Sequence, residues 1–330
     1  MALDINRSKV TKNAFRFTKV RGITALRLRV PGGEIMSEHL DLINKIAVKY
    51  GNGTLHITTR QGFEVPGIKF EDIPRINHEI ATLIKEVEID NGVKIKKAAK
   101  GYPAAGTRNI TACIGNKVCP FANFDTTALA LKIEKEIYPN DYHVKIAVSG
   151  CPNDCIKAHM QDFGITGMVE PVYLKDSCIA CDACVKKCTK LSARALENKK
   201  NRIIRNSTSC IGCGECVLAC PMHAWRRKPV KLFRIVIMGR TGKKNPRIAQ
   251  PFIEWASEEV VIKIIKNSYV YIDKYIDKTL TKEHVGYIVD RTGYHEFKRM
   301  VLDGVELNPE AVVADNINFV GTSYIPRLKS

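Results

Sequence analysis

Apolar and polar residues near the start of the chain follow first a strand-like and then a helix-like pattern. Residues 23–30 alternate between apolar and polar side chains, and apolar residues then recur at helical spacing up to Gly51. The order repeats with two short strands between residues 54 and 68 and a helix that Asp72 opens. Residues 10–90 are therefore predicted to form a small β-α-β-β-α layer.

The pattern after residue 92 predicts a larger mixed region that a separate segment interrupts. A helix, three strands and two further helices are expected, in chain order, at residues 129–137, 143–150, 163–169, 232–238, 251–275 and 282–302. The segment 172–226 falls between two of these apolar strands, which indicates an insertion. We therefore expect an α+β protein of three domains, at residues 1–92, at 93–171 together with 227–330, and at 172–226.

The composition is that of an ordinary globular chain, since 45% of its 330 residues are hydrophobic and 26% are charged. The first residues lack the apolar core of a secretion signal, and lysines interrupt the longest apolar stretches well before about 18 residues. We predict a cytoplasmic protein without a membrane span. Twelve cysteines in such a chain indicate metal ligands rather than disulfides.

Eight of the twelve cysteines form two runs of the spacing C-x2-C-x2-C-x3-C inside the predicted insertion. This spacing is typical of ferredoxins with two 4Fe–4S clusters, in which the fourth cysteine of each run binds the cluster of the other run. The predicted ligand sets are Cys178, Cys181, Cys184 with Cys220, and Cys210, Cys213, Cys216 with Cys188. Zinc is the alternative, but a tetrahedral zinc site does not require three closely spaced cysteines followed by a fourth, a pattern that occurs here two times.

The other four cysteines, Cys113, Cys119, Cys151 and Cys155, form a less specific pattern. Their spacings, C-x5-C and C-x3-C, fit a metal site and fit buried apolar cysteines about equally well. Basic residues expected beside them, and a ferredoxin segment whose electrons need an acceptor, favour the metal site.

Short motifs outside the insertion carry a resemblance to a known family. They are Thr-Thr-Arg-Gln at residues 58–61, Thr-Arg-Asn-Ile at 107–110, and Ser-Gly-Cys-Pro-Asn-Asp-Cys at 149–155. In these motifs the chain resembles the sirohaem sulfite and nitrite reductases, and its length and inserted ferredoxin make it look like a C subunit of anaerobic sulfite reductases. The resemblance implies a ferredoxin-like α/β layer, a sirohaem-binding catalytic domain, and an inserted two-cluster ferredoxin domain.

The resemblance also implies a set of cofactors. Cys113, Cys119, Cys151 and Cys155 would bind a third 4Fe–4S cluster, and Cys155 would also be the axial ligand of the sirohaem iron. Further residues expected to bind the cofactors are Thr59, Arg60, Gln61, Asn109, Asn153, Lys243, Lys244 and Arg247. The net charge of +18 would then largely offset the carboxylates of sirohaem and the negative charge of the clusters.

The implied activity is the six-electron reduction of sulfite to hydrogen sulfide. Arg60, Arg108, His143 and Lys145 would line the distal face of the sirohaem, where they would bind the anion and deliver protons. His143 and Lys145 lie two residues apart in a predicted strand and would therefore point to the same face. A histidine at this position suits proton donation, and a hydrogen bond in the core is the alternative role.

The chain contains no flavin or nicotinamide fingerprint, so its electrons are expected to come from another protein. In the family that it resembles, the donors are a flavin subunit that oxidises NADH and a further iron–sulfur subunit. Longer relatives contain two copies of the catalytic repeat and this chain contains one, so self-association or partner subunits are expected to supply the missing surface.

Three other functions remain open from the sequence. Nitrite reduction to ammonia would use the same pocket and the same number of electrons. A non-catalytic polyferredoxin would bind about eight irons per chain instead of about thirteen. Nucleic-acid binding is disfavoured, because the basic residues form no single long run.

Overall fold

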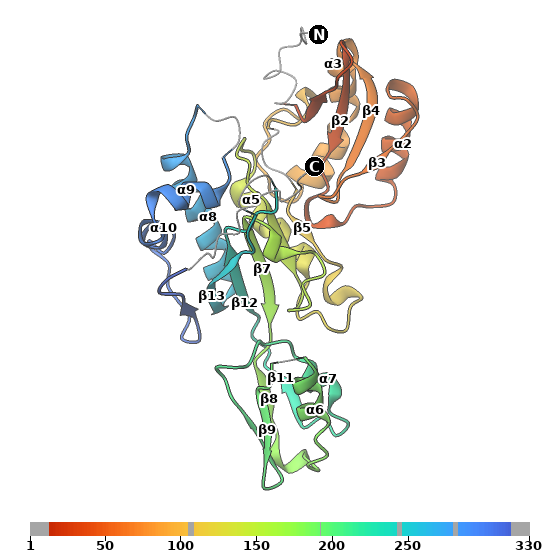
Figure 1. The fold of residues 1–330 in the computed structure, drawn as a ribbon. Helices are drawn as coiled ribbons and strands as arrows, with labels where there is room; N and C mark the ends of the chain where they lie inside the picture. Colours follow the sequence, from red (N-terminus) through yellow and green to blue (C-terminus); the bar gives the residue numbers. More distant parts are fainter. Residues whose placement is uncertain (1–12, 105–108, 192, 243–245, 280–282, 318–330) are drawn as a thin grey trace, which may run out of the picture. The chain divides into compact units, whose positions relative to one another are not determined.

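The computed structural model describes residues 13–104, 109–191, 193–242, 246–279 and 283–317 (Figure 1). The chain divides into two compact units, each assembled from three segments. The first unit consists of Met1–Ala112, Thr127–Ala147 and Ile264–Asp303, and the second of Cys113–Thr126, Val148–Lys263 and Gly304–Ser330. Among the described residues, no helix is both long enough and apolar enough to cross a membrane.

The first unit contains a four-stranded antiparallel sheet in the order β1-β2-β4-β3. Its strands are β1 (Phe15–Phe17), β2 (Ile23–Leu28), β3 (His56–Ile57) and β4 (Phe63–Lys69). Leu26 of β2 pairs with Val65 of β4, and both side chains are buried in one core with Ile43 of helix α2 (His39–Tyr50). Helices α3 (Ile73–Glu79) and α4 (Ala81–Ile84) add to the same core. The predicted layer is therefore present, with a shorter second strand and an additional first one.

The remaining helices of this unit come from two later segments. They are most of α5 (Thr126–Ile137) and α8 (Glu258–Tyr275), together with α9 (Val285–Thr292) and α10 (Tyr294–Val301). The sequence pattern predicts one helix at 282–302, whereas the structure has two. Gly293 separates them with a φ of +89°, a backbone conformation that glycine adopts without strain.

The second unit contains an antiparallel sheet built from β7 (Phe163–Met168), β12 (Leu232–Ile237), β13 (Gln250–Ala256) and β14 (Val312–Val313). Every residue of β7 is buried, including the polar Thr166, so both faces of the strand are covered. The predicted helix at 251–275 is wrong in its first turns, because residues 250–256 form β13. Ile253 pairs there with Ile235 of β12, a partner that no local pattern could reveal.

The inserted segment, drawn in green in Figure 1, begins and ends in one two-stranded ribbon. Strand β8 (Pro171–Tyr173) pairs with β11 (Trp225–Arg227), so the two ends of the insertion lie side by side. Between them lie α6 (Ala183–Lys190), the hairpin of β9 (Leu196–Lys199) and β10 (Arg202–Arg205), and α7 (Glu215–Ala219). Its small core combines apolar residues with cysteines.

A buried ionic cluster links the sheet of the first unit to helix α5. Arg29, which follows β2, forms ion pairs with Glu88 at 2.7 Å and with Glu134 of α5, and its guanidinium lies 3.8 Å from the centre of the Tyr138 ring. One cation thus faces two buried carboxylates. Burial, reinforced by the charge of Glu88 and opposed by Arg29, raises the pKa of Glu134 to about 7.

This cluster predicts a dependence of stability on pH. The folded protein holds a proton on Glu134 that the unfolded chain releases near pH 4.3, so stability is lost as pH rises from about 4 through about 7. Between pH 5 and pH 8, the free energy of unfolding of Glu134→Gln should fall by up to about 3 kcal/mol less than that of the wild type. Melting curves at several pH values, recorded for the wild type, for Glu134→Gln and for the control Glu136→Gln at an exposed position of the same helix, test this. The same dependence of stability on pH in all three proteins would contradict it.

Candidate functional site

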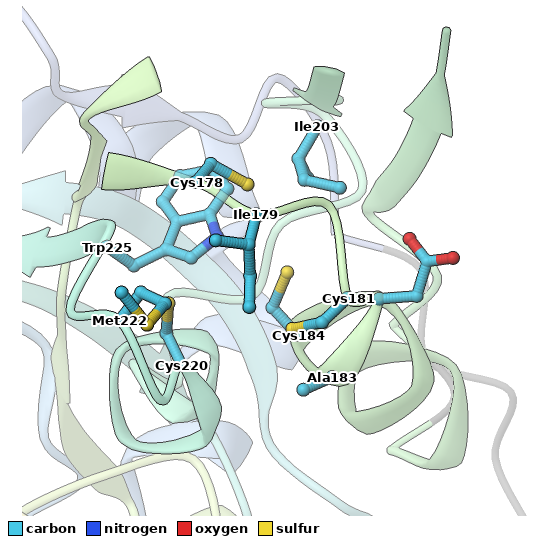
Figure 2. A pocket seen from close by; sticks show the side chains of 10 residues that line it. Cys178, Ile179, Cys181, Ala183, Cys184, Ile203, Cys220, Met222 and Trp225 are labelled. Carbon is cyan, nitrogen blue, oxygen red and sulfur yellow. The ribbon is translucent and has the colours of Figure 1, made fainter. Parts of the chain in front are cut away.

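The first predicted ferredoxin set surrounds one cavity in the insertion, which we call the outer cavity. Cys178, Cys181, Cys184 and Cys220 line it, together with apolar side chains that include Trp225 (Figure 2). Its empty volume is about 290 Å³, counting the part that is open to solvent. The structure thus gathers three cysteines from the first run and the fourth from the second run.

The second set surrounds a separate cavity of about 390 Å³, which we call the inner cavity. Cys188, Cys210, Cys213 and Cys216 line it. Burial, with contributions from nearby thiols, raises the pKa of Cys216 to about 12, and burial also raises that of Cys213. Without a metal these thiols stay protonated at neutral pH; bound iron would favour the thiolate form.

Backbone amides around both cavities donate hydrogen bonds to cysteine sulfurs. The donors are the N–H groups of Ala180, Ala195 and Ala224, which lie 3.4, 3.2 and 3.2 Å from the sulfurs of Cys178, Cys188 and Cys220. Such donors stabilise thiolate charge and tune the potential of iron–sulfur clusters. The cysteine sets, their spaces and these donors together fit a pair of 4Fe–4S clusters.

The two cysteine loops have the same backbone conformation but different surroundings. In the first loop Ala180 has a φ of +56°, and its counterpart in the second loop, Gly212, has a φ of +65°. A Cβ atom on Gly212 would lie 2.9 Å from Cβ of Met168 and 3.1 Å from the Trp255 ring. Alanine is therefore accommodated in the first loop, whereas the second loop packs too tightly against β7 and β13 for any side chain.

The third cysteine set lies in two loops of the second unit outside the insertion. Cys113 bonds through its N–H to Val148 O at 3.1 Å, and its sulfur accepts the Gly150 N–H at 3.1 Å. Cys151 is buried, and its pKa is raised by that burial and then by the neighbouring thiols of Cys119, Cys113 and Cys155. All four thiols therefore lie close enough to interact.

Cys155 differs from the other members of this set because its side chain is exposed. An exposed sulfur can reach a further ligand outside the loop, as the expected axial bond to a sirohaem iron requires.

In the described residues no three His, Cys, Asp or Glu side chains lie at the spacing of a single bound ion.

Asp154 holds the turn that carries Cys155. Its carboxylate accepts the N–H of Ala158 at 2.6 Å and that of His159 at 3.2 Å, and it lies 2.8 Å from Nδ1 of His159. Although burial opposes the change, these hydrogen bonds hold the pKa of Asp154 below its ordinary value. Asp154 also adopts a φ of +48°, which an aspartate tolerates better than most residues.

Arg60, expected at the anion site, is buried in the first unit. Its Nη2 atom donates to the backbone carbonyls of Asn109 at 2.6 Å and Ile146 at 2.7 Å. The buried Asn109 side chain in turn donates to Arg60 O at 3.2 Å. These contacts bring together two predicted site residues that lie 49 positions apart in the sequence.

Gln61 is tied to the backbone that leads into the third cysteine set. Its side-chain amide both donates to Ala112 O and accepts from Ala112 N, each at 2.8 Å. The neighbouring Thr59 is exposed. The sequence motif at 58–61 thus has a structural role in this unit in addition to the cofactor role expected from the resemblance.

His143 and Lys145 precede strand β6 (Ile146–Ser149) rather than lying within it. Both are half-buried, and the intervening Val144 is fully buried, so the alternation expected for a common face is retained. The His143 ring packs edge-on against His284, with 4.7 Å between ring centres. Sequence reasoning missed His284, because 141 positions separate it from His143 and no motif marks it.

The remaining expected cofactor residues lie in the second unit or outside the described part of the chain. Arg247 is half-buried and donates from Nε to Met238 O at 3.0 Å, while Asn153 is exposed. Arg108, Lys243 and Lys244 lie outside the described residues.

Comparison with known proteins gives consistent matches along the chain. The model of the nitrite and sulphite reductase 4Fe-4S domain matches residues 104–308, and that of the nitrite/sulfite reductase ferredoxin-like half domain matches residues 18–83. The chain is 42% identical over 330 residues to the C subunit of the anaerobic sulfite reductase of Salmonella typhimurium, covering 99% of this chain and 98% of that one. It is 27% identical over 152 residues to the chloroplastic ferredoxin–nitrite reductase of Betula pendula, covering 45% and 24%.

A solved structure shares the fold. Dissimilatory sulfite reductase I superimposes with a TM-score of 0.64 at 15% identity, covering 90% of this chain and 72% of that chain. The predicted α+β class is confirmed by this likeness and by the mixed sheets and helices of the structure.

The turn at Asp154 predicts a selective loss of iron. Asp154→Ala removes three hydrogen bonds and should loosen the Cys155 turn by about 1–2 kcal/mol. For a chain that carries three 4Fe–4S clusters and the iron of a sirohaem, iron should fall from about thirteen to about eight atoms, because the insertion would keep its clusters. Asp154→Asn, which keeps one acceptor, should lose less. Unchanged iron in Asp154→Ala would contradict the assigned role.

The two cysteine loops of the insertion predict different effects on stability for two small substitutions at equivalent positions. Gly212→Ala adds a methyl group that meets Met168 and Trp255, and should cost about 1–3 kcal/mol. Ala180→Gly, at the same position of the exposed loop, should change stability by less than about 1 kcal/mol. Thermal unfolding and protease sensitivity of the insertion measure both effects, and a tolerated Gly212→Ala would refute the close packing.

Proposed function

Because the chain belongs to the nitrite and sulfite reductase family, we propose that it is the catalytic subunit of a sulfite reductase, an oxidoreductase that reduces sulfite to hydrogen sulfide. The observation that carries the proposal is the grouping of the twelve cysteines into three sets of four, two in the insertion and one outside it. Together with the 42% identity over the full chain, this favours a subunit that accepts electrons and also uses them.

The proposed cofactors are three 4Fe–4S clusters and sirohaem. Cys155 would be the axial ligand of the sirohaem iron, and its exposure supports that choice over the buried Cys151. Thr59, Arg60, Gln61, Asn109, Asn153, Lys243, Lys244 and Arg247 are proposed to hold the carboxylates and the ring edge. When bound, the sirohaem would supply the redox chemistry at which sulfite is reduced.

The chain's own task would be to bind a small dianion and to supply protons. Arg60, Arg108 and Lys145 are proposed to stabilise the oxygens of sulfite electrostatically. Arg60 is well suited to this, because the carbonyls that accept from its Nη2 atom hold the guanidinium in one orientation. His143 is proposed as a proton donor, with the edge of His284 restricting its ring.

Sulfite is favoured over nitrite by the extent of the similarity. The sulfite reductase relative matches nearly the whole chain at 42% identity, whereas the nitrite reductase matches 45% of the chain at 27% identity. The inserted segment suits either substrate, since its two cysteine sets fit an electron inlet for a protein donor.

The proposed donors are partner subunits of one complex: a flavin subunit that oxidises NADH and a further iron–sulfur subunit. A cytoplasmic location, the absence of a nucleic-acid or membrane partner, and self-association of the chain are parts of the same proposal. Light scattering of the assembled enzyme would test the last of these.

An anaerobic absorption spectrum with iron and sulfide counted on the same sample tests the function. We expect a tetrapyrrole spectrum that sulfite perturbs, and about thirteen irons per chain. Cys155→Ala should lose the tetrapyrrole bands and keep about eight irons, because the insertion is untouched. A wild-type protein with about eight irons and no tetrapyrrole would reduce the chain to an electron carrier. Faster reduction of nitrite than of sulfite would favour the other family activity.

A further inference from the structure

The inner loop of the insertion is covered by the rest of the second unit. Gly212 O accepts the Val169 N–H at 2.8 Å, and Gly214 approaches Asn123, whose own N–H donates to Gly150 O at 2.8 Å. Arg227, at the end of the insertion, donates to the carbonyls of residues 120 and 122, each at 3.1 Å. The inner cavity therefore lies on the side of the third cysteine set.

The outer loop is open to solvent at the equivalent positions. Ile179 is 62% exposed, whereas its counterpart in the inner loop, Ile211, is half-buried. Met222 is 48% exposed and lines the same cavity as Ile179 (Figure 2). Cys181 is itself exposed. Two large apolar side chains are thus left uncovered directly over a cysteine set.

The inserted segment as a whole is basic. Residues 172–226 contain ten lysines and arginines and four acidic residues. Three of those acids are engaged internally, since Asp182 accepts from Asn198, Glu215 pairs with Lys187 and Glu197 pairs with Lys199. Lys175, three residues before Cys178, and Lys186 on α6 are both exposed. The charge complementary to this surface is negative.

We propose that Ile179, Met222, Lys175 and Lys186 form the docking surface for a small acidic electron-carrier protein. An apolar centre with a charged rim is the composition of specific interfaces, and transient redox complexes use small ones. Docking here brings the carrier next to the outer cysteine set, while the inner set stays covered by the enzyme. The proposal rests on the proposed function in that a reductase needs a protein donor, and it assigns this surface to the iron–sulfur donor, with the chemistry of a small acidic carrier.

Binding of a purified acidic two-cluster ferredoxin to the intact holoprotein tests the docking surface. At low ionic strength, Lys175→Glu/Lys186→Glu should raise Kd about tenfold or more, and 0.5 M salt should largely abolish that difference. Ile179→Glu should weaken binding at both salt concentrations, because it removes apolar contact as well. Lys231→Glu/Lys263→Glu changes net charge equally, lies outside the insertion, and should leave Kd within about twofold. Iron counts verify that each variant keeps its clusters.

The same proteins separate this proposal from the proposed function. Sulfite reduction driven by a reduced viologen dye, which needs no docking surface, should be unchanged in Lys175→Glu/Lys186→Glu while ferredoxin-driven reduction falls about tenfold. Absence of dye-driven activity in wild type would overturn the proposed function and leave the binding result standing. No ferredoxin binding, equal binding by all variants, or a loss of self-association instead of carrier binding would each overturn the docking proposal.

Discussion

Thiols packed around a small space repel one another once they ionise, and the second unit is organised around that constraint. Burial and neighbouring thiols raise the pKa of Cys216 to about 12, and burial raises the pKa of Cys151. Without metal both thiols therefore stay protonated at neutral pH, and bound metal would hold them as thiolates. The loops that carry the cysteines turn sharply enough to aim amide N–H groups at their sulfurs, which explains the positive φ angles at Ala180, Asp182 and Gly212.

The first unit buries charge in a different way, by using arginine as an internal connector. Arg29 binds Glu134 of α5 and Glu88 of the helical turn Lys85–Ile89, and Arg60 joins two distant backbone segments through their carbonyls. A guanidinium suits both tasks because it presents several donors in a rigid plane and stays charged when buried. Part of the basic excess of the chain therefore has a structural use.

Internal repetition in the insertion allows its two halves to be compared position by position. The halves share cysteine spacing and backbone conformation, yet one loop carries Ala180 and Asp182 where the other carries Gly212 and Gly214. Glycine in the second loop permits contact with Met168 and Trp255, and exposed Ile179 marks the first loop. A symmetric metal-binding unit thus acquires a covered side and an open side.

The sequence by itself determined the cysteine sets, the α+β class and the family, and the class and family are confirmed by comparison. These follow from short-range spacing and motifs, which can be recognised without knowledge of the fold. It could not reveal that residues 250–256 form a strand, that His284 packs on His143, or that Asp154 binds the turn after Cys155. Tertiary structure alone decided which cysteine loop is buried. Burial depends on side chains such as Met168 and Trp255, whose approach to Gly212 is set by sheet packing and not by their distance along the chain.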